Sequence, residues 1–330
     1  MGRGPISAPT LSLGSAPIGN LLKITPEEDA LDAVRAAWEG GVRYFDTAPH
    51  YGLGLAERRL GQALATYPRS EYLISTKVGR LLTPTSDFPG ETDLEDGFMV
   101  PKDFIRDLDY SGDAVMRSIE QSLKRMNTDY VDIVYVHDPD EHYEEALNGA
   151  LPALSRLRDE GVIKSFGCGM NQAEMLADFV RNSDLDVIML AGRYTLLDQG
   201  ALEALLPLAV EKNVSVVAAG VFNSGLLSKN RPASDASYNY IPATIEMMSK
   251  ANRIADICES YGVELPAVAA QFPLGHDAVA NICLGARTRE QVERNVSLFE
   301  VNIPVQLWEE LGESGVVKKE SVANFLGEAG

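Results

Sequence analysis

Eight short apolar segments, separated from one another by amphipathic or polar stretches, are the feature that most constrains the fold of this chain. They are rich in β-branched residues, and their apolar runs are nearly continuous, as expected of parallel strands covered on both faces. Strands alternating with helices form an α/β fold, and eight such units fit one (β/α)8 TIM barrel. An open doubly wound sheet is the alternative, because periodicity alone does not separate the two. The predicted strands are 11–19, 42–48, 72–78, 130–138, 163–170, 186–192, 214–222 and 278–286.

The first predicted helix carries clear start and stop signals. Thr25-Pro26-Glu27-Glu28 combines an N-cap residue, a proline at the first helical position and a later glutamate, which predicts a capping box. An apolar stripe follows, and Gly40-Gly41 is expected to end the helix. Since the chain has 330 residues and no low-complexity linker, residues 1–330 are expected to form a single domain.

One long segment, residues 80–112, shows no regular pattern and is predicted to be an irregular loop after the third strand. Loops of this length in a compact domain are usually functional or disordered. Its aromatic side chains and its place after a strand favour a wall of the substrate site. The aromatic residues are Phe88, Phe98, Phe104 and Tyr110.

The net charge of −19 argues against a nucleic-acid partner and against binding to an anionic membrane surface. Cys168, Cys258 and Cys283 are odd in number and not closely spaced, which fits reduced thiols better than disulfides or a metal site. The first twenty residues lack the apolar run of a signal peptide, and no segment reaches membrane-spanning length. We therefore expect a soluble cytoplasmic protein without a bound metal.

Polar residues follow three consecutive predicted strands, at the edge where active sites lie in barrels of this type. Asp46 and Tyr51 follow the second strand. Lys77 closes the third strand and His137 closes the fourth. Each residue alone is more often a turn cap or a structural side chain. Four of them at neighbouring strand ends predict one shared site.

The chemistry of these four side chains is complementary. A tyrosine has a reference pKa of about 10, and the ammonium of Lys77 is expected to lower the pKa of Tyr51. Asp46 would position that ammonium and compensate its burial, and His137 would orient a substrate oxygen. The set suits proton exchange with a carbonyl or hydroxyl oxygen, and it holds no nucleophile–base pair for acyl transfer.

These residues stand in stretches that resemble the aldo-keto reductase family. The resemblance runs in order along nearly the whole chain. Within the family, residues 104–123 followed by H-D-P-D resemble the sugar-oxidising branch of aldose 1-dehydrogenases and a pyridoxal 4-dehydrogenase. The stretches on which the family resemblance rests are Y-F-D-T-A-P-x-Y-G (44–52), S-T-K-V-G (75–79), D-Y-V-D-I-V-Y-V-H-D-P-D (129–140) and G-V-I-K-S-F-G-C-G (161–169).

The resemblance implies a (β/α)8 barrel that passes hydride to or from a nicotinamide cofactor. It implies that Tyr51 is the general acid and base, and that Lys77 and Asp46 form its supporting ion pair. His137 is then the residue that orients the substrate carbonyl. Glu57 resembles an acidic residue that family members keep after the tyrosine, and we expect it to brace the loop.

No G-x-G-x-x-G motif opens a helix here, which argues against a Rossmann domain and agrees with a barrel. The expected phosphate site lies instead in the loops after the last two strands, 220–229 and 284–295. Small residues in the first loop would let backbone N–H groups approach a pyrophosphate, and Thr288 is an N-cap candidate in the second. The predicted cofactor-binding residues are Gly19, Asn20, Asp46, Asn171, Gly220, Val221, Phe222, Asn223, Ser224, Gly225, Leu226, Lys229, Gly285, Arg287, Gln291 and Asn295.

The sequence departs from the family where the nicotinamide ring is usually held. Met170 and Ala191 occupy the places of an Asn and a Gln that bind the amide, and Ala219 replaces a stacking aromatic residue. Nearby Asn171 and Phe222 are the candidates to take over these contacts.

The sequence as a whole predicts an NAD(P)-dependent oxidoreductase that interconverts an aldose and its lactone, or another polar carbonyl compound and its alcohol. Arg287 favours NADP. By the family resemblance, Gln291 stands where many NADP-preferring relatives carry an arginine, which counts against NADP, and use of both cofactors is expected. The alternatives are a xenobiotic or keto-sugar carbonyl reductase, a catalytically quiet cofactor-binding regulatory barrel, and a Schiff-base enzyme using Lys77. The expected partner is a small-molecule carbonyl or sugar substrate, and the oligomeric state is not predicted.

Overall fold

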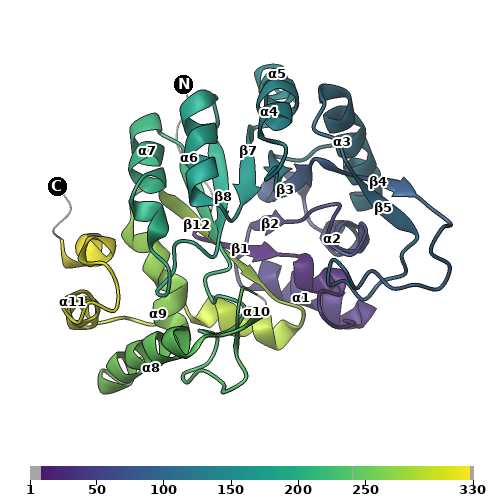
Figure 1. The fold of residues 1–330 in the computed structure, drawn as a ribbon. Coiled ribbons are helices and arrows are strands. Elements are labelled where there is room, and N and C mark those ends of the chain that lie inside the picture. Colours follow the sequence, from purple (N-terminus) through teal and green to yellow (C-terminus); the bar gives the residue numbers. More distant parts are fainter. Residues whose placement is uncertain (1–8, 240, 328–330) are drawn as a thin grey trace.

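In the computed structural model of the protein, which describes residues 9–239 and 241–327, eight parallel strands close into a barrel (Figure 1). Each strand lies within one of the eight predicted ranges, so the barrel prediction is confirmed and the open sheet is excluded. The strands are β1 (Leu11–Gly14), β2 (Tyr44–Asp46), β3 (Leu73–Val78), β6 (Ile133–His137), β7 (Ser165–Met170), β8 (Val187–Ala191), β9 (Ser215–Ala219) and β12 (Val279–Gly285). Around the barrel they follow the order β1-β12-β9-β8-β7-β6-β3-β2.

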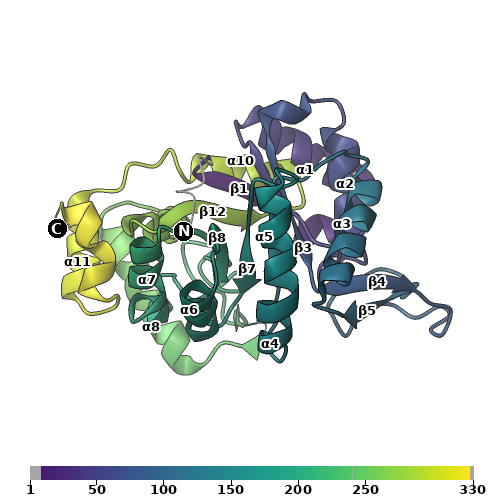
Figure 2. The ribbon, with the colours of Figure 1, turned by 90° about the horizontal axis from the view of Figure 1, so that it is seen from above.

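Helices surround the barrel, as two perpendicular views show (Figures 1 and 2). Their buried faces carry mainly small and aliphatic residues, which pack against the outer faces of the strands and form one continuous core. The α-helices are α1 (Glu27–Glu39), α2 (Leu55–Leu64), α3 (Gly112–Met126), α4 (Tyr143–Glu145), α5 (Leu151–Asp159), α6 (Ala173–Asn182), α7 (Leu205–Lys212), α8 (Ile245–Ser260), α9 (Leu265–Gln271), α10 (Arg289–Ser297) and α11 (Val305–Glu313).

The helix ends test two of the predicted N-caps. α10 begins as predicted, because the Thr288 hydroxyl accepts a hydrogen bond from the backbone N–H of Gln291. The capping box before α1 is wrong. Pro26 occupies the N-cap, and the Thr25 hydroxyl instead donates to the carbonyl of Pro17 at 3.0 Å. The local pattern assigned the Thr25 hydroxyl to the start of the helix, but in the fold this hydroxyl bonds to a carbonyl outside the helix.

The segment 80–112 is not an irregular loop. Its two ends form an antiparallel pair, β4 (Arg80–Pro84) and β5 (Phe104–Leu108), which lies outside the barrel on the side away from α11 (Figures 1 and 2). The connection between them returns to the barrel, where Met99 N–H donates to Asn20 and Leu22 N–H donates to Gly97. The insertion is thus a hairpin whose tip is tied to the loop after β1.

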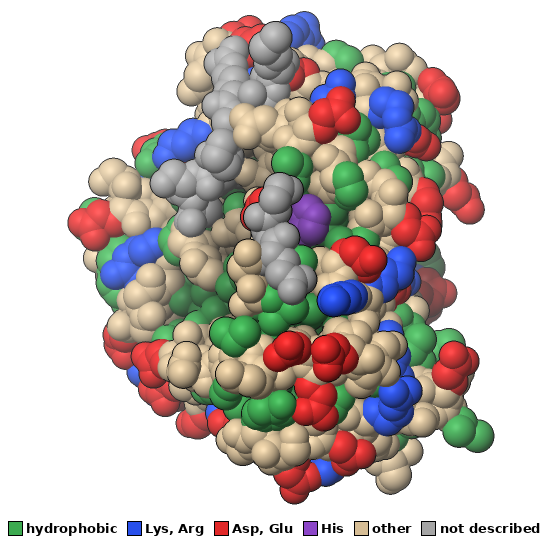
Figure 3. Space-filling model, turned by 90° about the vertical axis from the view of Figure 1, so that its left-hand side faces the viewer, with side chains coloured by type: hydrophobic (Ala, Val, Ile, Leu, Met, Phe, Trp, Pro, Cys, Tyr) green, Lys and Arg blue, Asp and Glu red, His purple; other side chains and the backbone are tan. Residues whose placement is uncertain are grey.

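The surface agrees with the acidic composition. On the face shown in Figure 3, acidic side chains are spread among the basic ones, and the described residues form no continuous basic patch there. Among the described helices, none combines the length and apolarity needed to cross a membrane.

Candidate active site

Three adjacent strands bring the predicted catalytic residues together. β2 pairs with β3 so that Asp46 lies opposite Ser75, and β3 pairs with β6 so that Lys77 lies opposite Tyr135. Asp46 and His137 are the last residues of their strands. Tyr51 follows in the turn between β2 and α2. The four side chains therefore meet at the carboxyl edge of the barrel.

This turn depends on a close backbone approach. Gly52 has a φ of +62°, and a Cβ on it would lie 2.2 Å from the carbonyl oxygen of Gly19. Gly19 in turn packs against the backbone of Tyr51, where its own Cβ would lie 2.9 Å from the carbonyl carbon. Only glycine fits at both positions, and their contact fixes where Tyr51 leaves the strand.

Lys77 and Asp46 form a buried ion pair. Lys77 Nζ lies 2.6 Å from Asp46 Oδ2, and the two side chains are 2% and 3% exposed. Nζ also donates to the carbonyl of Thr47 at 3.0 Å, and the Ser75 hydroxyl donates to Asp46 Oδ1 at 2.6 Å. Burial acts to lower the pKa of Lys77, but Asp46 and Tyr51 outweigh it and raise that pKa, so the ammonium is kept.

Tyr51 lies between this pair and His137. Its ring centroid is 4.6 Å from Lys77 Nζ and 5.8 Å from the perpendicular ring of His137. The expectation that Lys77 lowers the pKa of Tyr51 is only partly right. Burial raises that pKa more strongly than Lys77 lowers it, so the net shift is upward. In this state Tyr51 is a neutral phenol that can donate a proton.

His137 is a buried, neutral imidazole. Burial lowers its pKa well below the ordinary range, and the nearby cations Lys77, Arg80 and Arg106 act in the same direction. Its Nε2 lies 3.5 Å from Asp138 Oδ2, while its Nδ1 is buried without a partner among the described residues. A neutral imidazole retains one N–H, which suits it to donate a hydrogen bond to a substrate oxygen.

His50 is a site residue that the sequence analysis did not select. Its ring centroid lies 5.5 Å from that of His137, 6.0 Å from that of Tyr51 and 5.2 Å from that of Phe98. Its backbone carbonyl accepts from Arg106, which is also ion-paired with the fully buried Asp93. The signal in the sequence that could have identified His50 was its position, one residue before Tyr51. Phe98 belongs to the insertion, so this segment contributes a ring beside His50 and Tyr51.

The free energy of unfolding should report on these neutral imidazoles. Burial, helped by nearby cations, lowers the pKa of His50 to about 2. The unfolded chain binds the proton below about pH 6.5, so stability is lost as the pH falls from there toward the folded pKa. Each such histidine contributes a slope of about 1.4 kcal/mol per pH unit. Urea unfolding of wild type and His50→Gln between about pH 7 and 5 checks this. We expect a shallower slope in the variant, and equal slopes would refute it.

Glu57 is buried on α2 and joins two neighbouring elements, as expected of a bracing residue. It accepts from the hydroxyl of Thr76 at 2.8 Å and from Arg125 Nε at 2.5 Å. These contacts tie α2 to β3 and to α3.

A cleft of about 860 Å³ opens beside Tyr51. Its walls come from the loops after β1, β9 and β12, and it reaches Asp46 and Tyr51 at its inner end. Most of the predicted cofactor-binding residues line it, namely Asp46, Gly220, Val221, Phe222, Asn223, Ser224, Gly225, Lys229, Gly285, Arg287, Gln291 and Asn295.

Four predicted residues do not line this cleft. Gly19 packs under Tyr51, and Leu226 is buried in the core. The side chain of Asn20 is used within the fold, since its Oδ1 accepts from Arg59 and from Thr25 N–H while its Nδ2 donates to Met99. Asn171 lines a separate polar hollow.

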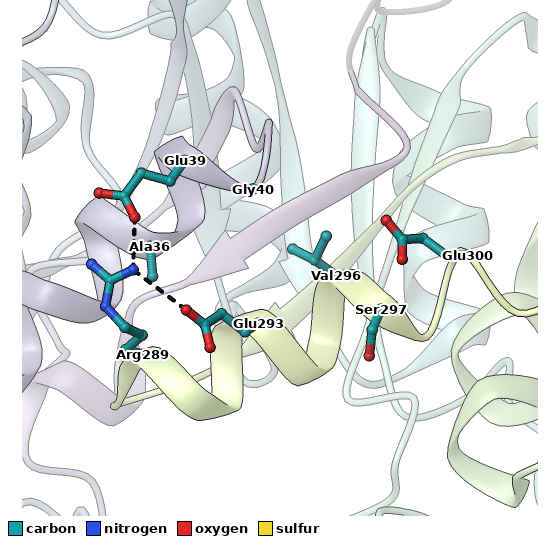
Figure 4. A pocket seen from close by; sticks show the side chains of 8 residues that line it. All are labelled: Ala36, Glu39, Gly40, Arg289, Glu293, Val296, Ser297 and Glu300. Atoms are coloured by element: carbon teal, nitrogen blue, oxygen red, sulfur yellow. Dashed lines mark hydrogen bonds and ion pairs between the residues drawn. The ribbon is translucent and has the colours of Figure 1, made fainter.

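The arginines near the outer end of the cleft differ in what holds them. Arg289 is paired with Asp32, and in a small hollow between α1 and α10 it is also paired with Glu39 and Glu293 (Figure 4). Arg294 is paired with Glu264. Arg287 instead donates to neutral oxygens, those of Leu21 at 2.9 Å, Lys23 at 3.2 Å and Thr25 at 3.3 Å. Its positive charge is therefore less compensated than that of the other two.

The cleft has groups that fit a dinucleotide. Its surface is shaped by glycines, and at Gly285 a Cβ would lie 3.0 Å from Pro17. Asn223 Oδ1 is buried in the cleft wall without a partner among the described residues. The start of α10 and the cation of Arg287 would favour phosphate groups. Within the described residues, no three His, Cys, Asp or Glu side chains are grouped as a metal site would require.

Comparison with known proteins places the chain in a family. A sequence model of the Aldo/keto reductase family matches residues 10–315. The chain is 42% identical to a D-threo-aldose 1-dehydrogenase of a Pseudomonas species over 314 residues, which are 94% of this chain and 95% of that one. It is 40% identical to the pyridoxal 4-dehydrogenase of Microbacterium luteolum over 333 residues, covering 96% and 97% of the two chains.

A solved structure supports the same assignment. The holo form of an aldo-keto reductase from Bacillus halodurans superposes with a TM-score of 0.75 at 25% identity, covering 97% of this chain and 95% of that one. The match in sequence, the closed barrel and the near-complete coverage agree. The chain therefore belongs to the aldo/keto reductase family and is an NAD(P)-dependent oxidoreductase that interconverts carbonyl compounds and alcohols.

Proposed function

We propose that Tyr51 exchanges the proton in this reaction. The observation that carries the proposal is the position of its ring, between the Lys77 ammonium and the His137 imidazole and at the inner end of the cleft. In reduction Tyr51 donates its proton to the carbonyl oxygen while His137 holds that oxygen. In oxidation Tyr51 takes the hydroxyl proton, and the Lys77 ammonium stabilises the phenolate that forms.

The cofactor would occupy the 860 Å³ cleft. When bound, a nicotinamide exchanges hydride with the reacting carbon of the substrate. Ser224, Gly225 and Lys229, which follow β9, would hold the pyrophosphate. Gly285, Arg287, Gln291 and Asn295 would hold the adenosine end. Since Asn171 lies outside this cleft, Phe222 and Asn223 are the better-placed residues near the nicotinamide end.

The substrate would be a polar carbonyl compound, and an aldose oxidised at its anomeric carbon fits best. Relatives named D-threo-aldose 1-dehydrogenase and L-galactose dehydrogenase favour a sugar. So do buried polar atoms of His137 and of side chains around it, which lack partners among the described residues. A hydroxyl-rich substrate would supply those partners. The atoms are His50 Nδ1, Arg80 Nε, Arg106 Nε, His137 Nδ1 and Asp140 Oδ1.

A substrate screen tests this function. Aldoses, pyridoxal and simple aldehydes would each be offered with NAD and with NADP, and the reaction followed by the absorbance of the reduced nicotinamide. We expect an aldose to give the highest kcat/KM. A preference for pyridoxal or an apolar aldehyde would reject the sugar, and no turnover at all would favour a regulatory barrel.

We propose that both cofactors bind, and that Arg287 distinguishes them. Its guanidinium lines the outer cleft, where the 2′-phosphate of NADP would add about two negative charges. Arg287→Ala should weaken NADP binding by about 1–3 kcal/mol, because a charge-assisted contact is lost, and NAD binding by less. Dissociation constants from nicotinamide fluorescence measure both. Arg289→Ala is the matched control, since its charge is already paired. Equal weakening of NAD and NADP would assign Arg287 to stacking on adenine.

We also propose a cytoplasmic location. All three cysteines are free and buried, and thiols without disulfides suit a reducing compartment.

A further inference from the structure

The insertion shares a small hydrophobic core with the turn that carries Tyr51, residues 47–54. This core is separate from the main core of the barrel, and the Tyr51 side chain packs against it. One of its buried residues comes from the turn, and the other three come from the insertion. The position of the turn therefore depends on how the insertion packs against it. The four buried residues are Leu53 of the turn and Leu82, Phe98 and Val100 of the insertion.

A buried ion pair lies within the insertion. Arg106 on β5 donates to both carboxylate oxygens of Asp93, with Nη1 2.8 Å from Oδ1 and Nη2 2.5 Å from Oδ2. The two side chains are 8% and 0% exposed. The Asp93 carbonyl accepts from the backbone N–H of Phe98 at 2.9 Å, so the ion pair holds the part of the insertion that carries the Phe98 ring. Two parallel N–H donors on one carboxylate fix its orientation as well as attracting it.

The same guanidinium also binds the turn that carries Tyr51. Arg106 Nη2 donates to the backbone carbonyl of His50 at 3.1 Å. The His50 ring stands edge-on to the Phe98 ring, with centroids 5.2 Å apart and planes 88° apart. Arg106 therefore fixes the His50 backbone directly, and it fixes the Phe98 ring through Asp93. Both rings lie beside Tyr51, with centroids 6.0 Å and 6.3 Å from that of the tyrosine.

The side chains of the insertion lie apart from the cofactor cleft. None of the described residues that line the 860 Å³ cleft comes from residues 80–112. The insertion meets the wall of the cleft at the loop after β1, through the backbone bonds given above, rather than with its own side chains. A displaced insertion should therefore change the surroundings of Tyr51 more than it changes the groups that would hold the cofactor.

We propose that Asp93 and Arg106 are positioning residues, whose ion pair holds two rings beside Tyr51 and thereby sets the orientation of the carbonyl substrate. The two rings are those of His50 and Phe98. Because desolvation offsets much of the attraction in a buried ion pair, the geometry that this pair fixes explains its presence better than stability does. The proposal rests on the role of Tyr51 given above.

Asp93→Asn is the sharpest test, because it nearly preserves the shape of a side chain that is buried and removes its charge. We expect kcat/KM for the carbonyl substrate to fall by about 10-fold, mainly through a higher KM, since a small misplacement of the substrate lowers the rate strongly. The dissociation constant of the cofactor should change much less. Arg106→Lys keeps the positive charge but loses the paired N–H donors, so it should raise KM further. Arg106 Nε is also open to the substrate, so the asparagine variant is the one that isolates positioning.

Lys102→Met is the matched control within the insertion. Lys102 Nζ lies 3.0 Å from Glu95 Oε2, but the Glu95 side chain is 85% exposed, so this ion pair fixes little. KM in this variant should equal that of wild type. A variant that is merely less stable contains less folded enzyme, which lowers the maximal rate and leaves KM unchanged. A rise in KM therefore separates positioning from stability.

Amide hydrogen exchange adds a measurement that needs no turnover. Residues 47–54 should exchange faster in Asp93→Asn than in Lys102→Met, because the turn has lost part of what holds it. Equal exchange in the two variants would overturn the proposal. So would a KM in Asp93→Asn equal to that of Lys102→Met, or a cofactor dissociation constant that rises as much as KM does.

Two further outcomes have a defined meaning. If Asp93→Asn does not fold, Arg106→Lys is judged by the same three comparisons with Lys102→Met. Failure of the proposed function would look different, because Tyr51→Phe would then retain its activity while the exchange of residues 47–54 still differed between the insertion variants.

Discussion

Replacing Tyr51 by phenylalanine is expected to lower kcat by about 10²–10⁴-fold, the usual contribution of a general acid or base. The ring still fits between Lys77 and His137, so the cleft keeps its shape and the cofactor should bind as in wild type. Only the proton that passes to or from the substrate oxygen is lost. Steady-state kinetics with the best substrate, together with cofactor titration, measure the two effects separately.

A second tyrosine provides the control for this substitution. Tyr67 stacks on Trp38 with ring centroids 4.1 Å apart, away from the four predicted catalytic residues. Tyr67→Phe also deletes one phenol hydroxyl, and it should leave kcat unchanged. If Tyr51→Phe turned over as fast as Tyr67→Phe, Tyr51 would not be the proton-exchanging group.

Replacing Lys77 by methionine should have the next largest effect, on both activity and stability. The substitution nearly preserves shape but leaves Asp46 charged, 3% exposed and without its cation. Removing one partner of a buried ion pair costs about 3–5 kcal/mol. The same change also removes the charge that stabilises the Tyr51 phenolate. Urea unfolding near neutral pH and the rate of oxidation are the measurements.

Lys318→Met is the matched control for this loss. Lys318 pairs with Glu203 at 3.0 Å, but the two side chains are 42% and 76% exposed. An exposed pair contributes about 0–1 kcal/mol, so this variant should be nearly as stable as wild type. Equal destabilisation by both substitutions would mean that burial of the Asp46–Lys77 pair is not what makes Lys77 important.

The sequence predicted the barrel because the signal is local. A nearly continuous apolar run is the pattern of a strand covered on both faces, and all eight runs became strands. The β4–β5 hairpin was missed for the opposite reason. Its strands are partly exposed and pair residues that lie twenty or more positions apart, as with Leu82 and Arg106. Such pairing leaves no apolar run in either segment.

Contacts between distant parts of the chain account for the other differences. Thr25 was expected to cap α1, but its hydroxyl meets Pro17. The carboxylates that neutralise Arg289 come mainly from α1, 250 or more positions earlier in the chain. The pKa of Tyr51 depends on how deeply the fold buries it, which no spacing records. The sequence was enough to predict which residue types stand at the strand ends. Their electrostatic surroundings could be described only from the folded structure.

The central claim is that, at this one site, the substrate loses a hydride from a carbon and a proton from the oxygen bound to that carbon. An isotope experiment tests this claim most directly. The best aldose would be prepared with deuterium at its anomeric carbon and oxidised with the preferred cofactor, and the reduced nicotinamide examined by mass spectrometry. We predict that the deuterium appears on the nicotinamide, at a rate that Tyr51→Phe lowers by about 10²-fold or more. Loss of the deuterium to solvent, or transfer at the same rate in Tyr51→Phe, would contradict the account.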